Sequence, residues 1–144
     1  MESRRKNPEK KHNSSYLLLQ KAGLRPTRQR LALADLLFDG AHKHVTAEQT
    51  FAATRKKRLR LSLATVYNTL NHFLAAGLMT QVAVDGGQVY FDTHTGPHHH
   101  IYNEESGDLT DIPASAVRIA RFPKLPKGKK LSRVDVMLRV RNSA

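Results

Sequence analysis

Three consecutive histidines, His98, His99 and His100, are the residues of this chain best suited to bind a metal ion or a haem. They open an apolar, β-rich run, and the side chains of a strand alternate between its two faces. We therefore expect His98 and His100 on one face, roughly 6.5–7 Å apart along the strand, and His99 on the other. One or two of these imidazoles can serve as axial ligands of a haem iron. A solvated, polar strand end is the alternative interpretation.

The chain contains no cysteine, which excludes disulfides, thiolate metal sites, iron–sulfur clusters and cysteine nucleophiles. Any metal site must therefore use histidine, carboxylate or backbone groups. The nearest acids, Glu104, Glu105 and Asp108, fall in a predicted turn, where side chains scatter rather than converge. A metal-dependent nuclease needs a tightly held ion with an open coordination position. It is the weak alternative, and we expect that the protein is not an enzyme.

Basic residues outnumber acidic ones by 24 to 12, which gives a net charge of +12 and a pI near 10.4. Such a charge indicates a polyanionic partner, either nucleic acid or an acidic membrane surface. The excess is larger before His98 than after it, so the N-terminal part is the better candidate for contacting a polyanion. The basic run 55–60 lies between two predicted helices, where it can contact phosphates. No stacking-aromatic sheet motif supports an RNA-binding alternative.

The chain of 144 residues is 40% hydrophobic, which is enough apolar material for folded cores. No run of about 18 apolar residues is present, so no transmembrane helix is expected. Residues 1–15 are polar and basic, which excludes a secretory signal and predicts a flexible arm. We therefore expect a cytoplasmic protein with no membrane partner.

Residues 16–92 carry strong helix and turn signals. Helices are predicted over 16–22 and 27–38, a third begins at the capping box of Thr46 and Gln49 with Phe51 and Ala52 inward, and a fourth follows Ser62. The fourth helix has one apolar stripe, formed by Leu63, Val66, Leu70, Phe73 and Leu74. Two β-rich runs, 79–84 and 88–92, flank Asp85-Gly86-Gly87 as a hairpin. This order of helices and hairpin predicts a winged-helix domain over residues 16–92.

Residues 93–97 are turn-formers and predict a hinge. Beyond them we expect strands at 98–102 and near Leu109, a helix over 114–121, and a strand over 134–140 whose alternation buries one face. About 47 residues make too small a core to be robust alone, which predicts a homodimer. The expected fold class is α+β, with a winged-helix DNA-binding domain followed by a small α/β dimerisation and ligand-sensing domain over 98–144.

Several segments resemble the ferric uptake regulator family, and the resemblance runs from about Leu17 to the C-terminus. The matching segments are Gly23-Leu24-Arg25-Pro26-Thr27-Arg28-Gln29-Arg30, His44-Val45-Thr46-Ala47-Glu48, Leu63-Ala64-Thr65-Val66-Tyr67 with Leu70-Asn71, and Tyr90-Phe91-Asp92 with the histidines after it. Within the family, residues 62–70 and the histidine triplet are most similar to the iron response regulators of rhizobia and related alphaproteobacteria. The resemblance implies a dimeric, iron- or haem-responsive repressor that binds inverted-repeat operator DNA.

The resemblance also implies which residues contact DNA. In the family the tyrosine corresponding to Tyr67 lies at the major groove, and Asn68 beside it is suited to bidentate contact with adenine. Ser62 and Thr65 can donate to phosphate at the helix N-terminus. The predicted DNA-binding residues are Arg25, Arg28, Lys57, Arg58, Arg60, Ser62, Thr65, Tyr67 and Asn68.

The family's regulatory metal site implies His44, Asp92 and His99 as ligands for Fe²⁺, Mn²⁺ or Zn²⁺, with Ile101 at the fourth position. The ligands of a second family site are replaced by Arg118 and Val134, apart from His98 and His100. A structural zinc held by four cysteines is impossible in this chain. Haem binding through the triplet His98, His99 and His100 is the favoured cofactor hypothesis, and a metal-dependent repressor that does not sense haem is the alternative.

Overall fold

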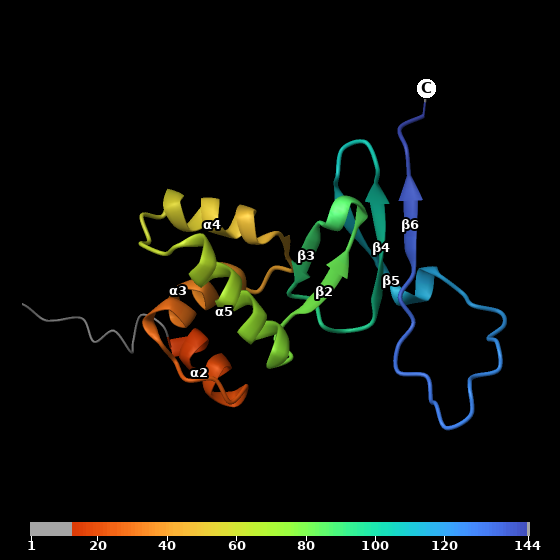
Figure 1. Cartoon of the computed structure of the whole chain (residues 1–144), viewed down its shortest axis with the longest axis horizontal. Helices are drawn as coiled ribbons and strands as arrows, with labels where there is room; N and C mark the ends of the chain where they lie inside the picture. Colours follow the sequence, from red (N-terminus) through yellow and green to blue (C-terminus); the bar gives the residue numbers. More distant parts are fainter. Residues whose placement is uncertain (1–12, 144) are drawn as a thin grey trace, which may run out of the picture. The chain divides into compact units, whose positions relative to one another are not determined.

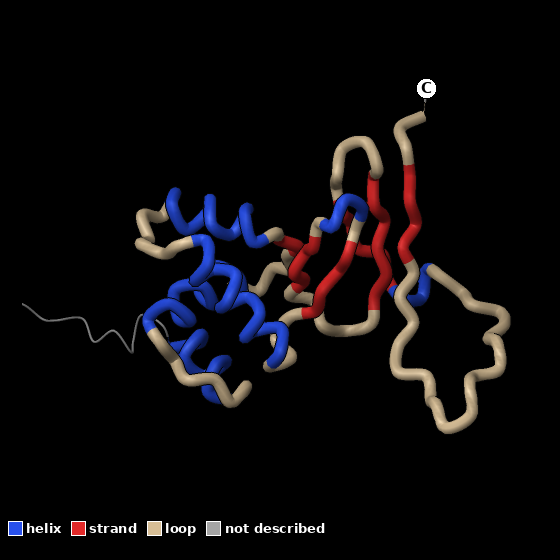
Figure 2. Tube along the Cα trace, viewed as in Figure 1, coloured by secondary structure: helices blue, strands red, loops and turns tan. Residues whose placement is uncertain are grey.

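The computed structural model describes residues 13–143 and has the expected α+β architecture (Figures 1 and 2). The chain divides into two compact units, residues 1–95 and 96–144. The division falls inside the segment 93–97 that the sequence assigns to a hinge. No helix within residues 13–143 is long and apolar enough to cross a membrane.

The described part of unit 1 contains four α-helices, α2 (Asn13–Lys21), α3 (Arg28–Leu37), α4 (Ala47–Lys56) and α5 (Leu63–Ala75). The last three start where the sequence predicts. Thr27, the first residue of its predicted helix, and the predicted caps Thr46 and Ser62 each accept a hydrogen bond from the backbone N–H three residues on. The capping box of α4 is complete, because the Gln49 side chain also accepts from the Thr46 backbone N–H at 3.0 Å. The start positions predicted from the sequence are therefore confirmed for these three helices.

The first helix starts earlier than the sequence predicts. Ser15, which the sequence assigns to the flexible arm, lies within α2, is buried and donates its hydroxyl hydrogen bond to Asp35 of α3. This tertiary contact satisfies the hydroxyl inside the helix. The rest of the predicted arm, residues 1–12, lies outside the described residues.

A small sheet completes unit 1. Strands β2 (Thr80–Ala83) and β3 (Val89–Asp92) form the predicted antiparallel hairpin, closed by the short turn η1 (Asp85–Gly87) (Figure 1). Strand β1 (His44–Val45) pairs with the other edge of β3, with His44 opposite Asp92. The sequence does not reveal β1, because two residues carry no periodicity.

The core of unit 1 lies between the helices and β3. Val66, Leu70 and Phe73 of α5 are fully buried, as predicted. The prediction that Leu63 belongs to this stripe is wrong: it is 38% exposed, because it occupies the first turn, beyond the end of the core. Ala52 is also exposed, since the buried positions of α4 are Ala47, Thr50 and Thr54, about one helical turn apart.

Unit 2 is a three-stranded sheet in the order β5-β4-β6, with β4 (His98–Asn103) at the centre, β5 (Leu109–Pro113) antiparallel to it and β6 (Met137–Val140) parallel to it. The predicted helix over 114–121 is wrong: only the single turn η2 (Ala114–Ala116) forms. Residues 117–136 contain no helix or strand and make a long excursion before β6 (Figure 2). A segment this short is marginal as a helix without a packing surface, and Pro123 follows it.

Candidate functional site

The first candidate surface is the solvent face of α5. Val66 and Leu70 point into the core, which leaves Tyr67 40% exposed and Asn68 exposed on the other side of the helix. These two side chains offer a phenol hydroxyl and an amide, which can donate and accept hydrogen bonds. The structure thus gives Tyr67 and Asn68 the accessibility that base contacts require.

Ser62 and Thr65, two further predicted contacts, are engaged with each other. The Ser62 hydroxyl accepts from the Thr65 N–H at 3.1 Å and donates to the Thr65 hydroxyl at 2.9 Å. The Thr65 carbonyl also accepts from the Thr69 hydroxyl. Their main structural role is to cap α5, whose first backbone N–H groups are left pointing outward as a partial positive charge.

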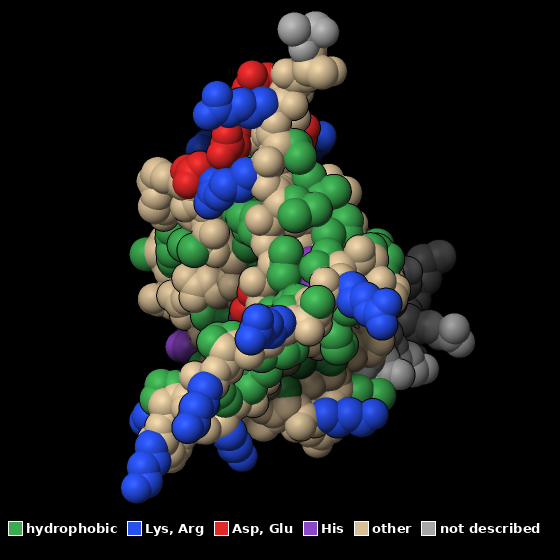
Figure 3. Space-filling view, turned by 90° about the vertical axis from the view of Figure 1, so that its right-hand side faces the viewer, with side chains coloured by type: hydrophobic (Ala, Val, Ile, Leu, Met, Phe, Trp, Pro, Cys, Tyr) green, Lys and Arg blue, Asp and Glu red, His purple; other side chains and the backbone are tan. Residues whose placement is uncertain are grey.

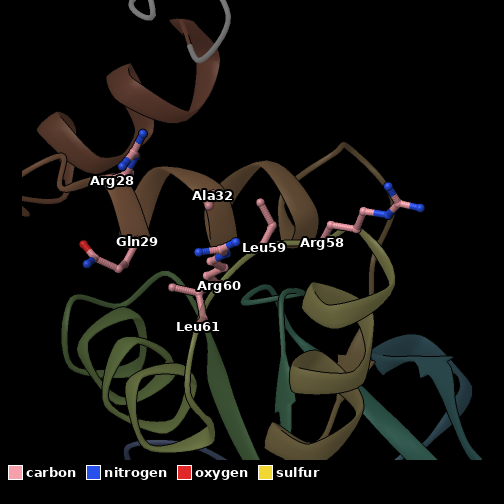
Figure 4. Close-up of a pocket in the computed structure, with 7 residues that line it drawn as sticks. All are labelled: Arg28, Gln29, Ala32, Arg58, Leu59, Arg60 and Leu61. Carbon is pink, nitrogen blue, oxygen red and sulfur yellow. The ribbon is translucent and has the colours of Figure 1, made fainter.

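The second candidate surface is a pocket of about 440 Å³ between α3 and the connector that joins α4 to α5. We call it the arginine pocket, because Arg28, Arg58 and Arg60 surround it (Figure 4). Its remaining lining residues are Gln29, Ala32, Leu59 and Leu61. Within residues 13–143, no carboxylate pairs with any of these three arginines, so their positive charge is uncompensated.

Two other predicted cations, Arg25 and Lys57, are exposed but do not line the arginine pocket. Arg30, which is not among the predicted contacts, links the elements behind the surface. Its guanidinium donates to the Arg25 carbonyl at 3.0 Å and lies 3.2 Å from Nδ1 of His72 on α5. His72 is therefore tied to the end of α3 through Arg30.

Two histidine–carboxylate groups are also present, one in each unit. In unit 1, the cross-strand partners His44 and Asp92 face each other, with 3.7 Å between His44 Nε2 and Asp92 Oδ2. Asp92 is fully buried, and its other oxygen accepts the backbone N–H of His94 at 2.8 Å. The ring of His94 stacks on His42 with 4.0 Å between centroids. Asp92 is thus oriented by its own unit, with one oxygen directed at an imidazole.

In unit 2, the alternation predicted for the triplet is confirmed. His98 and His100 share one face of β4, where their Nε2 atoms are 3.0 Å apart. His99 lies on the other face, and its Nδ1 accepts the backbone N–H of Val136 at 3.1 Å. The two face-sharing histidines meet Asp111 of β5, whose Oδ1 is 3.4 Å from His98 Nε2 and 3.3 Å from His100 Nε2.

These three atoms are spaced as ligands of one divalent ion would be. With bonds of about 2.0–2.2 Å, adjacent ligand atoms are about 3.3–3.6 Å apart around a tetrahedral ion and about 2.8–3.1 Å apart around an octahedral one. His98 Nδ1 lies 2.7 Å from the Gly96 carbonyl, so an N–H donated there leaves the Nε2 lone pair directed at the site. Two imidazoles and one carboxylate are a donor set for Zn²⁺, Mn²⁺ or Fe²⁺.

Asp111 is not among the site residues predicted from the sequence. The pairing register of β4 with β5 is what identifies it as a neighbour of the histidines. The turn between β4 and β5 places Asp111 directly opposite His100. In the predicted metal set His44, Asp92 and His99, the first two meet. His99 instead bonds to the segment before β6, and its neighbours on either side meet the carboxylate.

The acids invoked for a nuclease lie elsewhere. Glu104 accepts from the Arg141 guanidinium at 2.9 Å, Glu105 accepts from the Asn142 N–H at 3.2 Å, and Asp108 accepts from the Ser106 hydroxyl. Each carboxylate is held in or beside its own turn, so none of these contacts supplies the histidine triplet with a ligand.

Comparison with known proteins adds independent information. The sequence model of the ferric uptake regulator family matches residues 21–139. The ferric uptake regulation protein of Pseudomonas putida is 35% identical over 95 residues, which are 65% of this chain and 71% of that protein. The peroxide-responsive repressor PerR of Staphylococcus epidermidis is 31% identical over 118 residues, 82% of this chain and 73% of that protein.

Solved structures agree with these relatives. The ferric uptake regulator of Pseudomonas aeruginosa with manganese has a TM-score of 0.69 and 28% identity, and the match covers 92% of this chain and 98% of that one. The ferric uptake regulator of Vibrio cholerae has the same TM-score at 23% identity, covering 88% and 98%, which supports the fold alone.

Proposed function

The chain belongs to the ferric uptake regulator family, and from this premise we propose that it is a metal-responsive transcriptional repressor that binds double-stranded DNA as a homodimer. The observation that carries the proposal is the exposed face of α5, in a winged-helix unit where Arg28, Arg58 and Arg60 of the arginine pocket have no carboxylate partner within residues 13–143. A regulator of this kind reads bases with one helix and phosphates with surrounding cations.

In the proposed complex, α5 enters the major groove of each half of an inverted repeat. Tyr67 and Asn68 contact base edges, and the exposed N-terminus of α5 with Ser62 and Thr65 lies against the phosphates. Arg25, Arg28, Lys57, Arg58 and Arg60 supply the sequence-independent attraction. Base contacts carry about 1–3 kcal/mol of discrimination each.

The test is the affinity of Tyr67→Ala for an operator selected in vitro and for random duplex. The variant should bind the operator more weakly and random DNA almost as well as the parent, because the substitution removes base contacts and leaves phosphate contacts in place. Tyr67→Phe is the matched control and isolates the hydroxyl from the ring. Equal weakening on both duplexes would contradict the role assigned to Tyr67.

For the effector we propose a divalent ion bound by His98, His100 and Asp111, supported by the mutual spacing of their three ligand atoms. Titration calorimetry with Zn²⁺ and Mn²⁺ should show binding that His100→Ala and Asp111→Asn abolish or sharply weaken. His99→Asn is the control, because asparagine can still accept the Val136 N–H. Unchanged binding by His100→Ala would refute this ligand set.

Haem is the second candidate effector, as in the iron response regulators that residues 62–70 and the triplet resemble. One imidazole of the triplet can ligate haem iron. The two Nε2 atoms of His98 and His100 lie side by side, 3.0 Å apart, whereas two axial ligands approach iron from opposite faces. A Soret band that survives replacement of all three histidines by alanine would exclude the triplet as the haem site.

His44 and Asp92 remain a proposed metal pair of unit 1, supported by their 3.7 Å separation and by the orientation of the buried carboxylate. His44→Ala should reduce the response of DNA binding to Mn²⁺ or Fe²⁺ and leave haem binding intact. A coupling of this kind requires that the ion favour one DNA-binding state over another.

The homodimer is supported by the apolar surface that unit 2 leaves exposed. Phe122 is 53% exposed, Leu131 52% and Leu138 45%. On the face drawn in Figure 3, hydrophobic side chains are exposed among lysines and arginines. A second copy that covers such a surface would hold two winged helices on one inverted repeat.

A further inference from the structure

Three helices of unit 1 end in the same hydrogen-bonded turn. In α2 the Leu24 N–H donates to the Leu19 carbonyl, in α5 the Leu78 N–H donates to Phe73, and in α4 the Leu59 N–H donates to Thr54, each at 2.9 Å. This turn needs a left-handed residue just before the donor. Two of the helices place glycine there, and α4 places arginine.

The arginine is Arg58, with a φ of 57°, whereas Gly23 and Gly77 have φ values of 74° and 78°. It is the one non-glycine residue with positive φ among residues 13–143. A β-carbon makes this conformation unfavourable, and glycine is the usual residue at this helix end. An arginine here destabilises the turn relative to the two glycine ends of the same unit.

Among residues 13–143, no contact of the Arg58 side chain compensates for this strain. The Arg58 side chain is exposed, and within residues 13–143 it has no ion pair and no side-chain hydrogen bond. The side chain instead stands at the arginine pocket, with Arg28 on α3 and Arg60 two residues along the connector. Strain that the fold itself does not need is a reason to look for a functional role.

We propose that the arginine pocket is a contact site for the DNA backbone, and that the left-handed conformation of Arg58 serves to direct its guanidinium at a phosphate. This inference rests on the proposed DNA-binding function and deepens it. Guanidinium groups bind phosphate bidentately. The lining of the pocket carries no carboxylate that would compete for them: Ala32, Leu59 and Leu61 are apolar, and Gln29 is a neutral amide.

The arrangement of the three arginines favours a nucleic acid strand over a single small anion. In Figure 4 their side chains extend in different directions from the pocket rather than converging on one point. Cations spread in this way match successive phosphates along a backbone. The connector also runs directly into Ser62 and α5, so phosphate contacts here and base contacts by Tyr67 can form on one duplex.

The experiment compares Arg58→Gly, Arg58→Lys and Lys57→Gly in the full chain. Affinity for a mixed-sequence 30-base-pair duplex is measured by fluorescence anisotropy at several salt concentrations, and thermal unfolding is followed without DNA. Lys57 is the matched comparison: it is an adjacent exposed cation that the proposed function also assigns to phosphate contact, but it has a right-handed conformation (φ −86°) and lies outside the pocket.

Arg58→Gly should raise Tm and weaken DNA binding. The slope of the logarithm of the binding constant against the logarithm of the salt concentration should become shallower by about 0.9 for each phosphate that the variant no longer neutralises. The affinity difference from the parent should then shrink about threefold to fourfold between 50 and 200 mM salt. Arg58→Lys should keep the parent Tm and most of the affinity. Lys57→Gly should lower Tm and change the salt slope less than Arg58→Gly does. Arg28→Ala should weaken DNA binding to the same extent as Arg58→Gly, but without the rise in Tm.

The inference is overturned if Arg58→Gly binds the duplex with the parent affinity and slope, or if Lys57→Gly weakens binding as much. If the parent protein itself binds no duplex, the proposed DNA-binding function is wrong. That outcome differs from one in which the parent binds and Arg58→Gly binds equally well, which contradicts only the role of Arg58. Inorganic phosphate tests whether the pocket binds a free phosphate ion instead of the phosphates of a DNA backbone. If it raises the Tm of the parent but not of Arg58→Gly, while DNA binding is equal in both, the pocket binds a free anion and the DNA assignment is wrong.

Discussion

The two units of this chain differ sharply in how they bury apolar side chains. Unit 1 has a continuous core in which Leu33, Val66, Leu70 and Phe73 are fully buried. Among the described residues of unit 2, Tyr102 is the one buried large apolar residue. The exposed large apolar side chains of that unit are Ile119, Phe122, Leu125, Leu131, Leu138 and Val140.

This difference indicates that the units are stabilised in different ways. Unit 1 contains enough buried apolar surface to define its own fold. Unit 2 is a thin sheet with a long excursion, and a domain of this size buries too small a fraction of its surface to be stable alone. A second copy and a bound ion are the two stabilising contributions that its exposed surface and its ligand atoms suggest.

Removal of the largest core side chain of unit 1 should give the largest loss of stability. Phe73→Ala deletes a fully buried ring that also contacts Phe38, with 5.5 Å between centroids. We expect the free energy of unfolding to fall by about 3–5 kcal/mol. Phe122→Ala in unit 2 is the matched control and should change the stability of the monomer little. If urea denaturation showed equal losses of unfolding free energy for Phe73→Ala and Phe122→Ala, the two units would not differ in how buried apolar side chains stabilise them.

A charge on the apolar edge of unit 2 should act on assembly rather than on folding. Leu138 is exposed on β6, so Leu138→Asp leaves the single chain intact. Val136 is less suitable for this test because its backbone bonds to both His99 and His100. Leu138→Asp should be monomeric by sedimentation, with operator affinity reduced about 10²–10⁴-fold as the two half-sites are no longer linked. A fully active monomer would contradict the dimer.

A divalent ion should protect unit 2 selectively. At a free concentration of 100 times Kd it stabilises the bound state by about 2.7 kcal/mol. Hydrogen exchange should slow in β4 and β5 and stay unchanged in α5. His100→Ala should remove the effect, and a lower pH should weaken it because a ligating imidazole must be neutral. Equal protection of α5 would show that the ion does not act through unit 2 alone.

Helix capping in unit 1 should give the smallest effect. Thr46→Ala removes the side-chain acceptor for the Gln49 N–H at 3.0 Å and half of a capping box. The expected cost is about 1 kcal/mol. Thr110→Ala, an exposed position on β5, should stay within about 0.5 kcal/mol of the parent in the same thermal unfolding measurement.

Local signals predicted the winged helix well because each acts over a few residues. The caps at Thr27, Thr46 and Ser62 and the Asp85-Gly86-Gly87 turn are all present in the structure. The helix predicted over 114–121 failed because helical propensity in a short segment needs a surface to pack against. Strand β6 is shorter than predicted, since its pairing with β4 begins only at Met137.

The sequence by itself determined the alternation of the histidine triplet, the positions of the helix caps and the excess of positive charge. Which imidazoles meet a carboxylate was decided by sheet register, because Asp111 becomes a neighbour of His98 and His100 only when β5 pairs with β4. Tertiary structure likewise selected Arg28, Arg58 and Arg60 from many basic residues and placed them around one pocket. Spacing along the chain fixes the face of an element, whereas a site needs contacts between residues far apart in the sequence, and only packing supplies these.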